Sequence, residues 1–313
     1  MILIDYSHLF YRSIFPNKNM ILENINFCAH STLSMILNVS KQFGASRKNP
    51  LVIAVDSKPS WRHKYYETFS VDLPGYEELT YKGHRIKDPM FDWKEMDIIN
   101  KDILEILKLY SDFYVIDVKY AEADDVIAVL AQEATDDPYY IISSDKDFKQ
   151  LQQHNVHIYD PIKVMFLPEI DVDHFKKIHF MVGDTSDNIL AIKPRIAEKT
   201  AEKLFPELDT LLATNPEMRM KYEFNKKLID FDEIPCYIRD KIKKETEKQV
   251  HSFDAAKLMN MFRKYELANL TERISEFRLY DKEKTTPMIT QLTQQKSTEN
   301  YIDNCLNDFF VDE

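Results

Sequence analysis

Residues 121–148 read AEADDVIAVLAQEATDDPYYIISSDKDF and place acidic groups before a helical pattern and after a strand-like run. Glu122, Asp124 and Asp125 open the helical stretch, and Asp145 and Asp147 follow the apolar run YYII, which is typical of a buried strand. Each acidic group alone has an ordinary interpretation, because carboxylates cap helices and complement the helix dipole. Their repetition elsewhere in the chain is what needs an explanation.

The same alternation of strand and helix extends through the first half of the chain. Apolar runs rich in Ile, Val and Tyr predict four buried strands, at residues 1–5, 51–56, 113–118 and 139–144. Residues 22–43 and 95–110 carry apolar positions at helical spacing. Strands that alternate with helices predict an α/β fold with a mainly parallel central sheet and flanking helices.

Three regions follow from this pattern. Residues 1–167 are expected to form the α/β core, with a long aromatic and basic insert at about 57–94. Residues 168–280 are expected to form a helical region, and residues 281–313 a polar linker and tail. The helices predicted in the second region lie at 171–182, 197–205, 217–229, 235–249 and 254–265.

Carboxylates recur at the predicted strand ends. They are Asp5, Asp56, Asp145 with Asp147, and Glu122 with Asp124 at the helix start after residues 113–118; Asp184 and Asp187 follow separately in the later string GDTSDN. Ligands of parallel sheets bind beyond the carboxyl ends of the strands, so the acids of the four strand ends can converge on one site. Gathered carboxylates repel one another and need a compensating cation. Oxygen ligands suit Mg²⁺ or Mn²⁺, so the pattern predicts a two-metal phosphodiesterase.

The net charge of −11 at first argues against a polyanionic substrate. Nine of the acids lie in the groups described above, and five more lie in the last fifteen residues. Without those fourteen acids the remaining body carries a charge of +3. The acidity is therefore local, and nucleic acid remains compatible with the composition.

The combination of motifs resembles the 5′-nuclease (flap endonuclease) superfamily over about residues 1–280. The matching strings are LIDYS, AVDSKPSWR, EADD, SSDKD and GDTSDN, and the longer strings EADDVIAVL and LIDFDEIP are most similar to T-even phage members. The resemblance implies a PIN-like nuclease core, a basic arch formed by the insert, and a helix–turn–helix-type element that binds duplex. That element would complete the active site.

The resemblance also implies two metal sites. Asp5, Asp56, Asp124 and Asp145 would surround the first ion, with Glu122 nearby. Asp147, Asp184 and Asp187 would surround the second, and Asp125 would support the ligands without binding an ion. Two Mg²⁺ (or Mn²⁺) ions can flank a scissile phosphate, so Asp124 and Asp145 are candidate catalytic residues.

The insert supplies the expected cations. Lys82 and Arg85 in YKGHR resemble the family element that points at the scissile phosphate, and Arg62 resembles an upstream arginine. The aromatic residues Trp61, Tyr65, Tyr66 and Tyr81 are candidates for stacking on unpaired bases. The alternative is a solvated loop with aromatic anchors. The gap between Arg62 and Tyr81 is longer than usual for the family, so WRHKYY competes for part of the phosphate-binding role.

The segment after GDTSDN departs from the family pattern. The expected glycines are replaced by Ala191, Arg195 and Ala197, so close approach of backbone to phosphate should be weaker. The remaining candidate phosphate contacts are Lys193, Arg195, Lys199 and Thr200. Phosphate contacts position a duplex without reading its sequence, which predicts selectivity for structure with little base preference.

The tail and the cysteines bear on partners and location. Tyr301–Phe310, with the string CLNDFF, resembles the sliding-clamp-binding peptides of replication proteins, although a frayed or self-docked tail is the simpler interpretation. Three widely spaced cysteines, Cys28, Cys236 and Cys305, indicate neither a disulfide framework nor a zinc site and favour a reducing cytoplasm. No apolar run reaches the length of a membrane span.

The predicted function is a metal-dependent 5′ nuclease for single-strand/duplex junctions. It would act as a 5′→3′ exonuclease on RNA–DNA and DNA duplexes and as a flap endonuclease, removing RNA primers or flaps in replication. Its partners would be branched or nicked DNA and RNA–DNA duplex, and it would act as a monomer. The alternatives are a catalytically silent branched-nucleic-acid-binding protein of the same fold and a small-molecule phosphohydrolase.

Overall fold

The computed structural model describes residues 1–84, 88–135, 137–153 and 155–281. Within these ranges a six-stranded sheet has the order β3-β2-β1-β4-β5-β6. Its strands are β1 (Ile2–Asp5), β2 (Leu51–Val55), β3 (Tyr114–Asp117), β4 (Tyr139–Ile142), β5 (Val156–Asp160) and β6 (Met165–Phe166). The first five pair in parallel, and β6 is antiparallel to β5. The predicted α/β class and all four predicted strands are confirmed.

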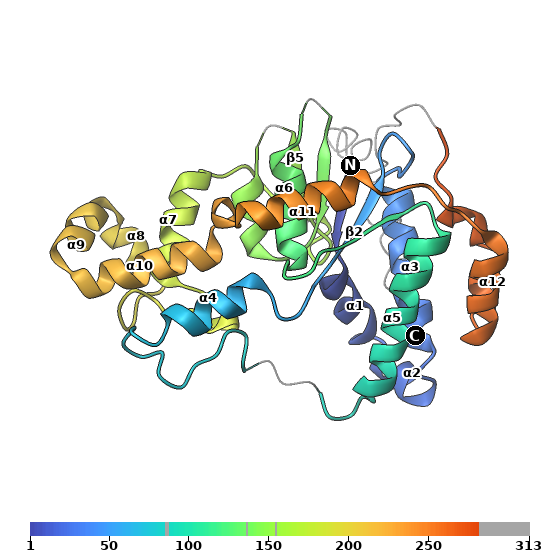
Figure 1. The fold of residues 1–313 in the computed structure, drawn as a ribbon, viewed down its shortest axis with the longest axis horizontal. Helices are drawn as coiled ribbons and strands as arrows, with labels where there is room; N and C mark the ends of the chain where they lie inside the picture. The colour runs from blue at the N-terminus through green and yellow to red at the C-terminus, as the bar shows by residue number, and fades with distance from the viewer. Residues whose placement is uncertain (85–87, 136, 154, 282–313) are drawn as a thin grey trace, which may run out of the picture.

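Alternating side chains of the strands supply two separate cores. Ile2 and Ile4 of β1 face a cluster formed with one set of helices, and Leu3 faces a second cluster on the other side of the sheet. The first set comprises α1 (Tyr6–Ile14), α2 (Lys18–Glu23), α3 (Phe27–Gln42), α5 (Trp93–Tyr110), α12 (Ala255–Lys264) and α13 (Ala268–Thr271). The second set comprises α6 (Ala123–Gln132) and α11 (Cys236–Glu247). The sheet therefore lies between two helical layers (Figure 1).

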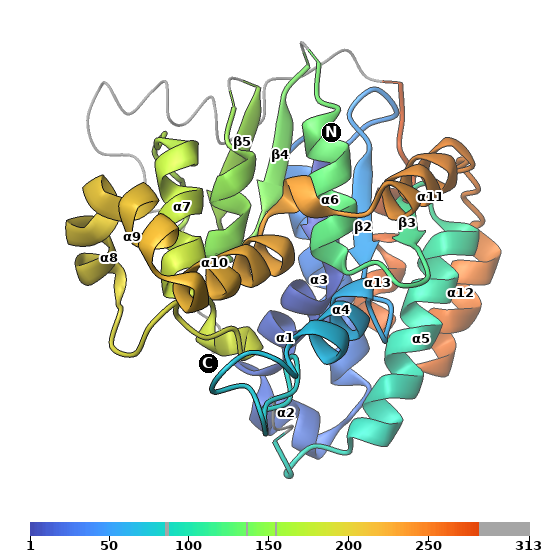
Figure 2. The ribbon, with the colours of Figure 1, turned by 60° about the vertical axis from the view of Figure 1, so that its left-hand side comes forward.

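A third core holds the remaining helices together at one side of the sheet. It joins α4 (Trp61–Phe69) to α7 (Val172–Val182), α8 (Glu198–Leu204), α9 (Leu208–Thr214) and α10 (Pro216–Ile229). Figure 2 shows α7 to α10 grouped beside the edge that carries β5. The later helices α11 and α12 pack on α6 and α5 instead, so the chain returns to the α/β core after α10.

Residues 65–81 of the insert are folded against this third core. Tyr66 of α4 is fully buried, and Leu73, Tyr76 and Tyr81 beyond it are at most 5% exposed. The rings of Tyr66 and Tyr76 pack against Phe224 of α10. These apolar contacts hold the insert against the helical region. Within the described residues, no helix is both long and apolar enough to span a membrane.

Several predictions lie beyond the described residues. Arg85 is one of them, and so are Cys305 and the tail segment Tyr301–Phe310. Cys28 and Cys236 are both free thiols, as the sequence predicts. The strands β5 and β6 were not among the predicted elements.

Candidate active site

The acidic groups meet at the carboxyl edge of the sheet, where the strand order reverses between β1 and β4. Asp5 ends β1 and caps α1, with its Oδ1 accepting a hydrogen bond from the His8 amide at 3.0 Å. Asp56 follows β2 and accepts from the Ala123 amide at 2.9 Å. Asp145 follows β4 and accepts from the Asp147 amide at 2.9 Å. These hydrogen bonds fix the carboxylates where α/β sheets bind their ligands.

Asp124 faces the carboxylates of the neighbouring strand ends. The residue is half-buried with its Oδ1 enclosed, and burial raises its pKa well above the ordinary value, with Asp5 and Asp145 adding to the effect. Burial, together with Asp56, raises the pKa of Asp5 to about 7. Asp5, Asp56, Asp124 and Asp145 are therefore close enough to repel one another, as expected of a first ion site.

Glu122 differs from these carboxylates because protein groups already surround it. Burial alone would raise its pKa, but Lys82 and Arg62 lower that pKa to about 2. Its two oxygens accept hydrogen bonds from Ser60 Oγ at 3.0 Å, Lys82 Nζ at 3.0 Å, Arg62 Nη1 at 3.2 Å and Tyr81 Oη at 3.2 Å. With four donors in place, Glu122 anchors the insert to α6.

Arg62 does not face solvent, so its predicted contact with nucleic acid is wrong. The side chain is 3% exposed, and its Nη1 lies 2.7 Å from Asp125 Oδ1 and 3.2 Å from Glu122. Its Nε donates to the Leu228 carbonyl at 2.8 Å. Burial opposes the charge, yet Asp125 and Glu122 hold the pKa of Arg62 above its usual range. The Arg62 side chain is buried because it supplies the positive charge that the buried carboxylates of Asp125 and Glu122 require.

Three of the four aromatic residues predicted to stack on bases are buried, and for them that role is wrong. Trp61 and Tyr81 are 6% and 5% exposed, and Tyr66 is fully buried. Trp61 Nε1 donates to Asp125 at 3.0 Å, and Tyr66 Oη donates to the Asn188 carbonyl at 2.8 Å. These rings anchor the insert, which corresponds to the alternative interpretation. Tyr65 is half-buried against Phe224.

Lys82 links the two groups of carboxylates. Its Nζ lies 3.0 Å from Glu122 Oε1 and 3.7 Å from Asp187 Oδ2, and its side chain is 18% exposed. The backbone of Lys82 has a positive φ of 57°, and its amide donates to the Asp187 carbonyl at 3.2 Å. The insert therefore delivers an ammonium group to the edge of the carboxylate cluster.

The second group of acids is held by a tight turn after α7. Gly183 ends that helix at φ 70°, and a Cβ there would lie 2.4 Å from the Ile189 carbonyl, so only glycine fits. Asp184 then forms an antiparallel bridge with Ile189. Its Oδ1 accepts from the Ser186 amide and hydroxyl at 2.7 and 2.6 Å.

Asp147, Asp184 and the unpredicted residue His179 form a compact cluster. One potential ligand atom from each lies within 4.8 Å of the other two. Burial raises the pKa of Asp147 to about 7, although His179 opposes the shift. Asp187 lies to one side, accepting from Tyr81 Oη at 3.2 Å. Nothing in the sequence distinguished His179 from an ordinary core histidine of α7.

The residues present fit divalent cations. The Oδ1 atoms of Asp124 and Asp147 are buried and have no hydrogen-bond partner among the described residues. A cavity of about 20 Å³ is lined by Glu122, Asp124, Asp147 and Asp184, among others, and is large enough for one water-sized species. Buried carboxylate oxygens without donors are costly unless a cation faces them. The oxygen-rich donor set suits a hard divalent ion.

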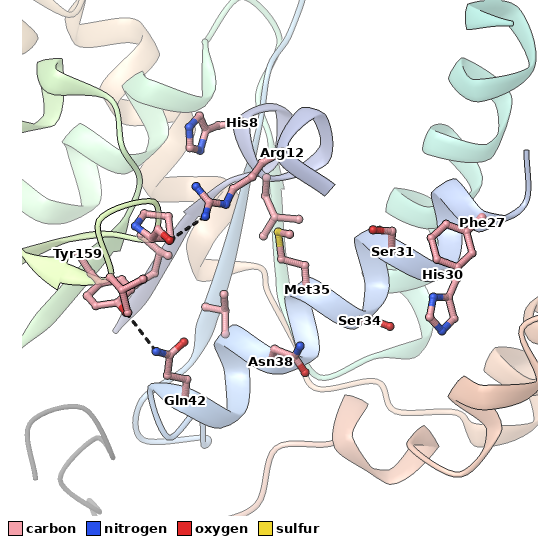
Figure 3. A pocket seen from close by; sticks show the side chains of 15 residues that line it. His8, Arg12, Phe27, His30, Ser31, Ser34, Met35, Asn38, Gln42 and Tyr159 are labelled. Atoms are coloured by element: carbon pink, nitrogen blue, oxygen red, sulfur yellow. Dashed lines mark hydrogen bonds between the residues drawn. The ribbon is translucent and has the colours of Figure 1, made fainter. Parts of the chain in front are cut away.

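A separate cavity of about 310 Å³ lies between α1, α3 and the end of β5. Figure 3 shows Arg12 at its wall, donating to the Pro161 carbonyl at 2.7 Å, and Gln42 donating to Tyr159 Oη at 3.4 Å. Among the described residues that line this cavity there is no carboxylate. His8 connects it to the acidic edge, because its Nε2 lies 2.8 Å from Ser144 Oγ. The cavity is therefore distinct from the carboxylate site.

The predicted duplex contacts lie in the segment that leads into α8 and in the first turn of that helix. Arg195, Lys199 and Thr200 are exposed, and Lys193 is half-buried. Arg195 has a φ of 66°, which is the left-handed conformation that glycine adopts readily. The backbone thus keeps a glycine-like turn even though the residue is arginine.

Comparison with known proteins identifies the family. Residues 1–178 match the 5′-3′ exonuclease N-terminal resolvase-like domain, and residues 195–277 match the C-terminal region of T4 RNase H. The chain is 26% identical over 306 residues to the ribonuclease H of Enterobacteria phage T4, covering 88% of this chain and 95% of the phage protein. It is 25% identical over 302 residues to a 5′-3′ exonuclease of Mycoplasmopsis pulmonis, covering 84% and 93% of the two chains.

Solved structures show the same fold. The flap endonuclease of bacteriophage T5, solved with DNA and metal ions, matches with a TM-score of 0.58 and 18% identity. The match covers 79% of this chain and 96% of the phage chain. The resemblance inferred from the motifs is thereby confirmed, and with it the predicted class of enzyme. The chain belongs to the 5′-3′ exonuclease family, whose members are phosphodiester hydrolases.

Proposed function

We propose that this protein is a divalent-metal-dependent 5′ nuclease selective for single-strand/duplex junctions, acting as a 5′→3′ exonuclease and as a flap endonuclease. The observation that carries the proposal is the set of buried, unpaired carboxylate oxygens at the sheet edge, bordered by an insert that brings in Lys82. Removal of RNA primers or 5′ flaps during replication is the corresponding biological role. The phage T4 and T5 relatives, named ribonuclease H and flap endonuclease, support it.

The metal requirement follows from the donor set. Asp5, Asp56, Asp124 and Asp145 would hold one ion, and Asp147 and Asp184 would contribute to a second, with Asp187 beside them. Two Mg²⁺ or Mn²⁺ ions bound there would activate water and neutralise charge on the scissile phosphate. Glu122 has a different role, because its donors from the insert already occupy both of its oxygens.

Lys82 is the candidate for direct contact with the substrate phosphate. Its ammonium lies between Glu122 and Asp187 and is partly exposed, so a phosphate arriving at the cluster would meet it. A lysine acts on a phosphate as a point charge that stabilises the developing negative charge. Arg85, three residues further on, remains the second proposed cation of the insert.

The duplex would lie against the segment that leads into α8 and the first turn of that helix. The exposed Arg195, Lys199 and Thr200, with Lys193 beside them, would bind the phosphate backbone and fix the distance from duplex to carboxylates. Contacts of this kind position the junction without reading bases. Branched or nicked DNA and RNA–DNA duplex are therefore the proposed substrates.

Three further proposals concern the protein's surroundings. The tail segment Tyr301–Phe310 would bind a sliding clamp, the enzyme would act as a monomer, and it would work in the cytoplasm of a phage-infected host. Capture of a purified clamp by the full chain but not by a chain ending at residue 281 would support the first proposal. Equal capture by both chains would contradict it.

A cleavage assay tests the proposed function. The pure protein is incubated with a 5′-labelled flap, a nicked RNA–DNA hybrid and a plain single strand, each with Mg²⁺ and with EDTA. We expect metal-dependent release of short 5′ products from the two junction substrates only. Tight junction binding without cleavage in Mg²⁺ or Mn²⁺ would instead support the catalytically silent alternative.

A further inference from the structure

His179 occupies a position in the carboxylate cluster that the proposed two-metal site does not require. It lies on α7, five residues before Asp184, and its side chain is 5% exposed. Its Nδ1 is 3.7 Å from Asp147 Oδ1, and its Nε2 is 3.7 Å from Asp184 Oδ2. Both distances exceed a hydrogen bond, and neither ring nitrogen has a hydrogen-bond partner among the described residues.

A buried imidazole with two unpaired nitrogens needs an explanation. Leaving a buried polar group without a partner costs about 1–3 kcal/mol. Asp147 Oδ1, which faces the ring, is also buried and unpaired. On the other side, Asp184 Oδ2 has Lys146 Nζ at 3.4 Å, and that lysine is about half exposed. The ring and Asp147 therefore lack partners at the same place, which indicates that a further species binds between them.

The distances suit ligand atoms that share one ion. Ligand bonds of about 2.1 Å at tetrahedral or octahedral angles place neighbouring ligand atoms about 3.0–3.4 Å apart. One ring nitrogen of His179 can bind the ion, and each nitrogen lies 3.7 Å from a different carboxylate oxygen, slightly more than this. With one ligand atom taken from each of the three residues, all three atoms lie within 4.8 Å of one another. A small inward movement of side chains would close the set around an ion.

We infer that His179 is a nitrogen ligand of the second metal ion and gives that site a preference for Mn²⁺, Co²⁺ or Zn²⁺ over Mg²⁺. This inference rests on the proposed metal-dependent function. Mg²⁺ selects oxygen ligands and keeps its waters, whereas imidazole nitrogen binds the later transition ions more strongly. The second ring nitrogen then faces a carboxylate, which is the usual acceptor for the N–H of a metal-bound histidine.

The experiment is performed on the full chain without nucleic acid. Mn²⁺ is added to the metal-free protein, and pulsed electron paramagnetic resonance measures nitrogen hyperfine coupling to the bound ion. We expect a ¹⁴N coupling that becomes a ¹⁵N coupling when the protein carries ¹⁵N-labelled histidine. Absence of any nitrogen coupling from bound Mn²⁺ would overturn the inference, and this measurement needs no substitution that might disturb folding.

Substitutions identify which histidine is responsible. His179→Gln should abolish the nitrogen coupling and weaken Mn²⁺ binding at one of the two sites by about tenfold, with a smaller change for Mg²⁺. His8→Gln tests a second histidine near the acidic edge, and His174→Gln is the matched control because His174 lies on the same helix and pairs with Glu202. Persistence of the coupling in His179→Gln, or its loss in His8→Gln alone, would contradict the assignment.

The outcome is separable from that of the proposed function. Nitrogen coupling from His179 in a protein that cleaves no junction substrate would support the ligand assignment while contradicting the nuclease. Junction cleavage with Mg²⁺ together with purely oxygen-ligated Mn²⁺ would leave the nuclease intact and overturn the role of His179. The two claims can therefore fail independently.

Discussion

Lys82 places its ammonium nitrogen 3.0 Å from the Glu122 carboxylate, joining the insert to the start of α6 across forty positions of sequence. Burial would raise the pKa of Glu122, but Lys82 and Arg62 lower that pKa to about 2, so the Glu122 carboxylate is ionised in the physiological range. The contact fixes the insert beside the carboxylates before any substrate arrives. It also leaves Lys82 partly exposed, where a phosphate can reach it.

Replacing Lys82 should affect the chemical step more than substrate affinity. We expect Lys82→Ala to lower the single-turnover cleavage rate by about 10²–10³-fold, because a cation aimed at developing phosphate charge is lost. Rapid-quench cleavage of a labelled flap measures the rate, and fluorescence anisotropy measures affinity. Lys64→Ala, an exposed lysine of the same insert, is the matched control. An unchanged rate in Lys82→Ala would rule out the proposed contact.

Arg62 should be needed for folding. Arg62→Ala leaves Asp125 and Glu122 buried with one cation fewer, and breaking a buried ion pair from one side costs about 3–5 kcal/mol. Urea unfolding should show this loss, whereas Arg263→Ala at an exposed position of α12 should change stability little. A loss below about 1 kcal/mol for Arg62→Ala would show that the pair is not structurally important.

The stability of the metal-free protein should fall as pH rises toward neutrality. The pKa values of Asp5 and Asp147 are raised from about 4 to about 7 in the folded state, so the folded chain binds more protons than the unfolded chain between those values. Glu122, whose pKa is lowered, acts oppositely, but its contribution is complete above its unfolded pKa of 4.5. Between about pH 5 and 7 the change in stability is therefore set by Asp5 and Asp147, and the free energy of unfolding falls as pH rises.

Divalent ions should reverse this trend, because they bind the deprotonated carboxylates. We expect the increase in melting temperature caused by Mg²⁺ or Mn²⁺ over EDTA to be larger at about pH 8 than at about pH 5.5. Thermal unfolding at both pH values measures it. In Asp147→Asn, one of the titrating groups is absent and the difference should shrink. An increase independent of pH would contradict the assigned carboxylates.

Lys199 should contribute to binding without affecting where cleavage occurs. Lys199→Ala removes one proposed phosphate contact, so the slope of log affinity against log salt should fall by about one. Affinity measured over a range of KCl concentrations gives the slope, and Lys248→Ala, an exposed lysine at the end of α11, is the control. An identical slope in Lys199→Ala and the unmodified protein would place the duplex elsewhere.

The carboxylates at the strand ends were predictable, because an acid that directly follows a buried apolar run must lie at the end of that strand. Asp5, Asp56 and Asp145 each follow an apolar run long enough to be a buried strand, and parallel strands bring such positions to one edge. The shorter strands β5 and β6 were not predicted. VHIYD in β5 is interrupted by the exposed His157, and β6 has two residues, so neither gives a strong strand pattern.

Burial was the main property that the sequence did not reveal. Arg62, Trp61 and Tyr81 have the composition of a nucleic-acid-binding loop, but all three are buried. Tyr81 packs in the third core, and Arg62 and Trp61 bind the buried carboxylate of Asp125 in α6. His179 was missed for a different reason. A single histidine on an amphipathic helix carries no signal until the turn at Gly183 brings Asp184 back beside it.

The most direct test of the metal site is the substitution Asp124→Asn, measured for both cleavage and binding of a labelled flap in Mg²⁺. The Oδ1 of Asp124 is buried and has no hydrogen-bond partner among the described residues, and burial, with Asp5 and Asp145, raises the pKa of this carboxyl, so it should bind an ion. The account predicts that cleavage is abolished while flap binding and the melting temperature in EDTA are retained or increased. Turnover close to that of the unmodified protein would contradict the proposal that these carboxylates hold the catalytic metal.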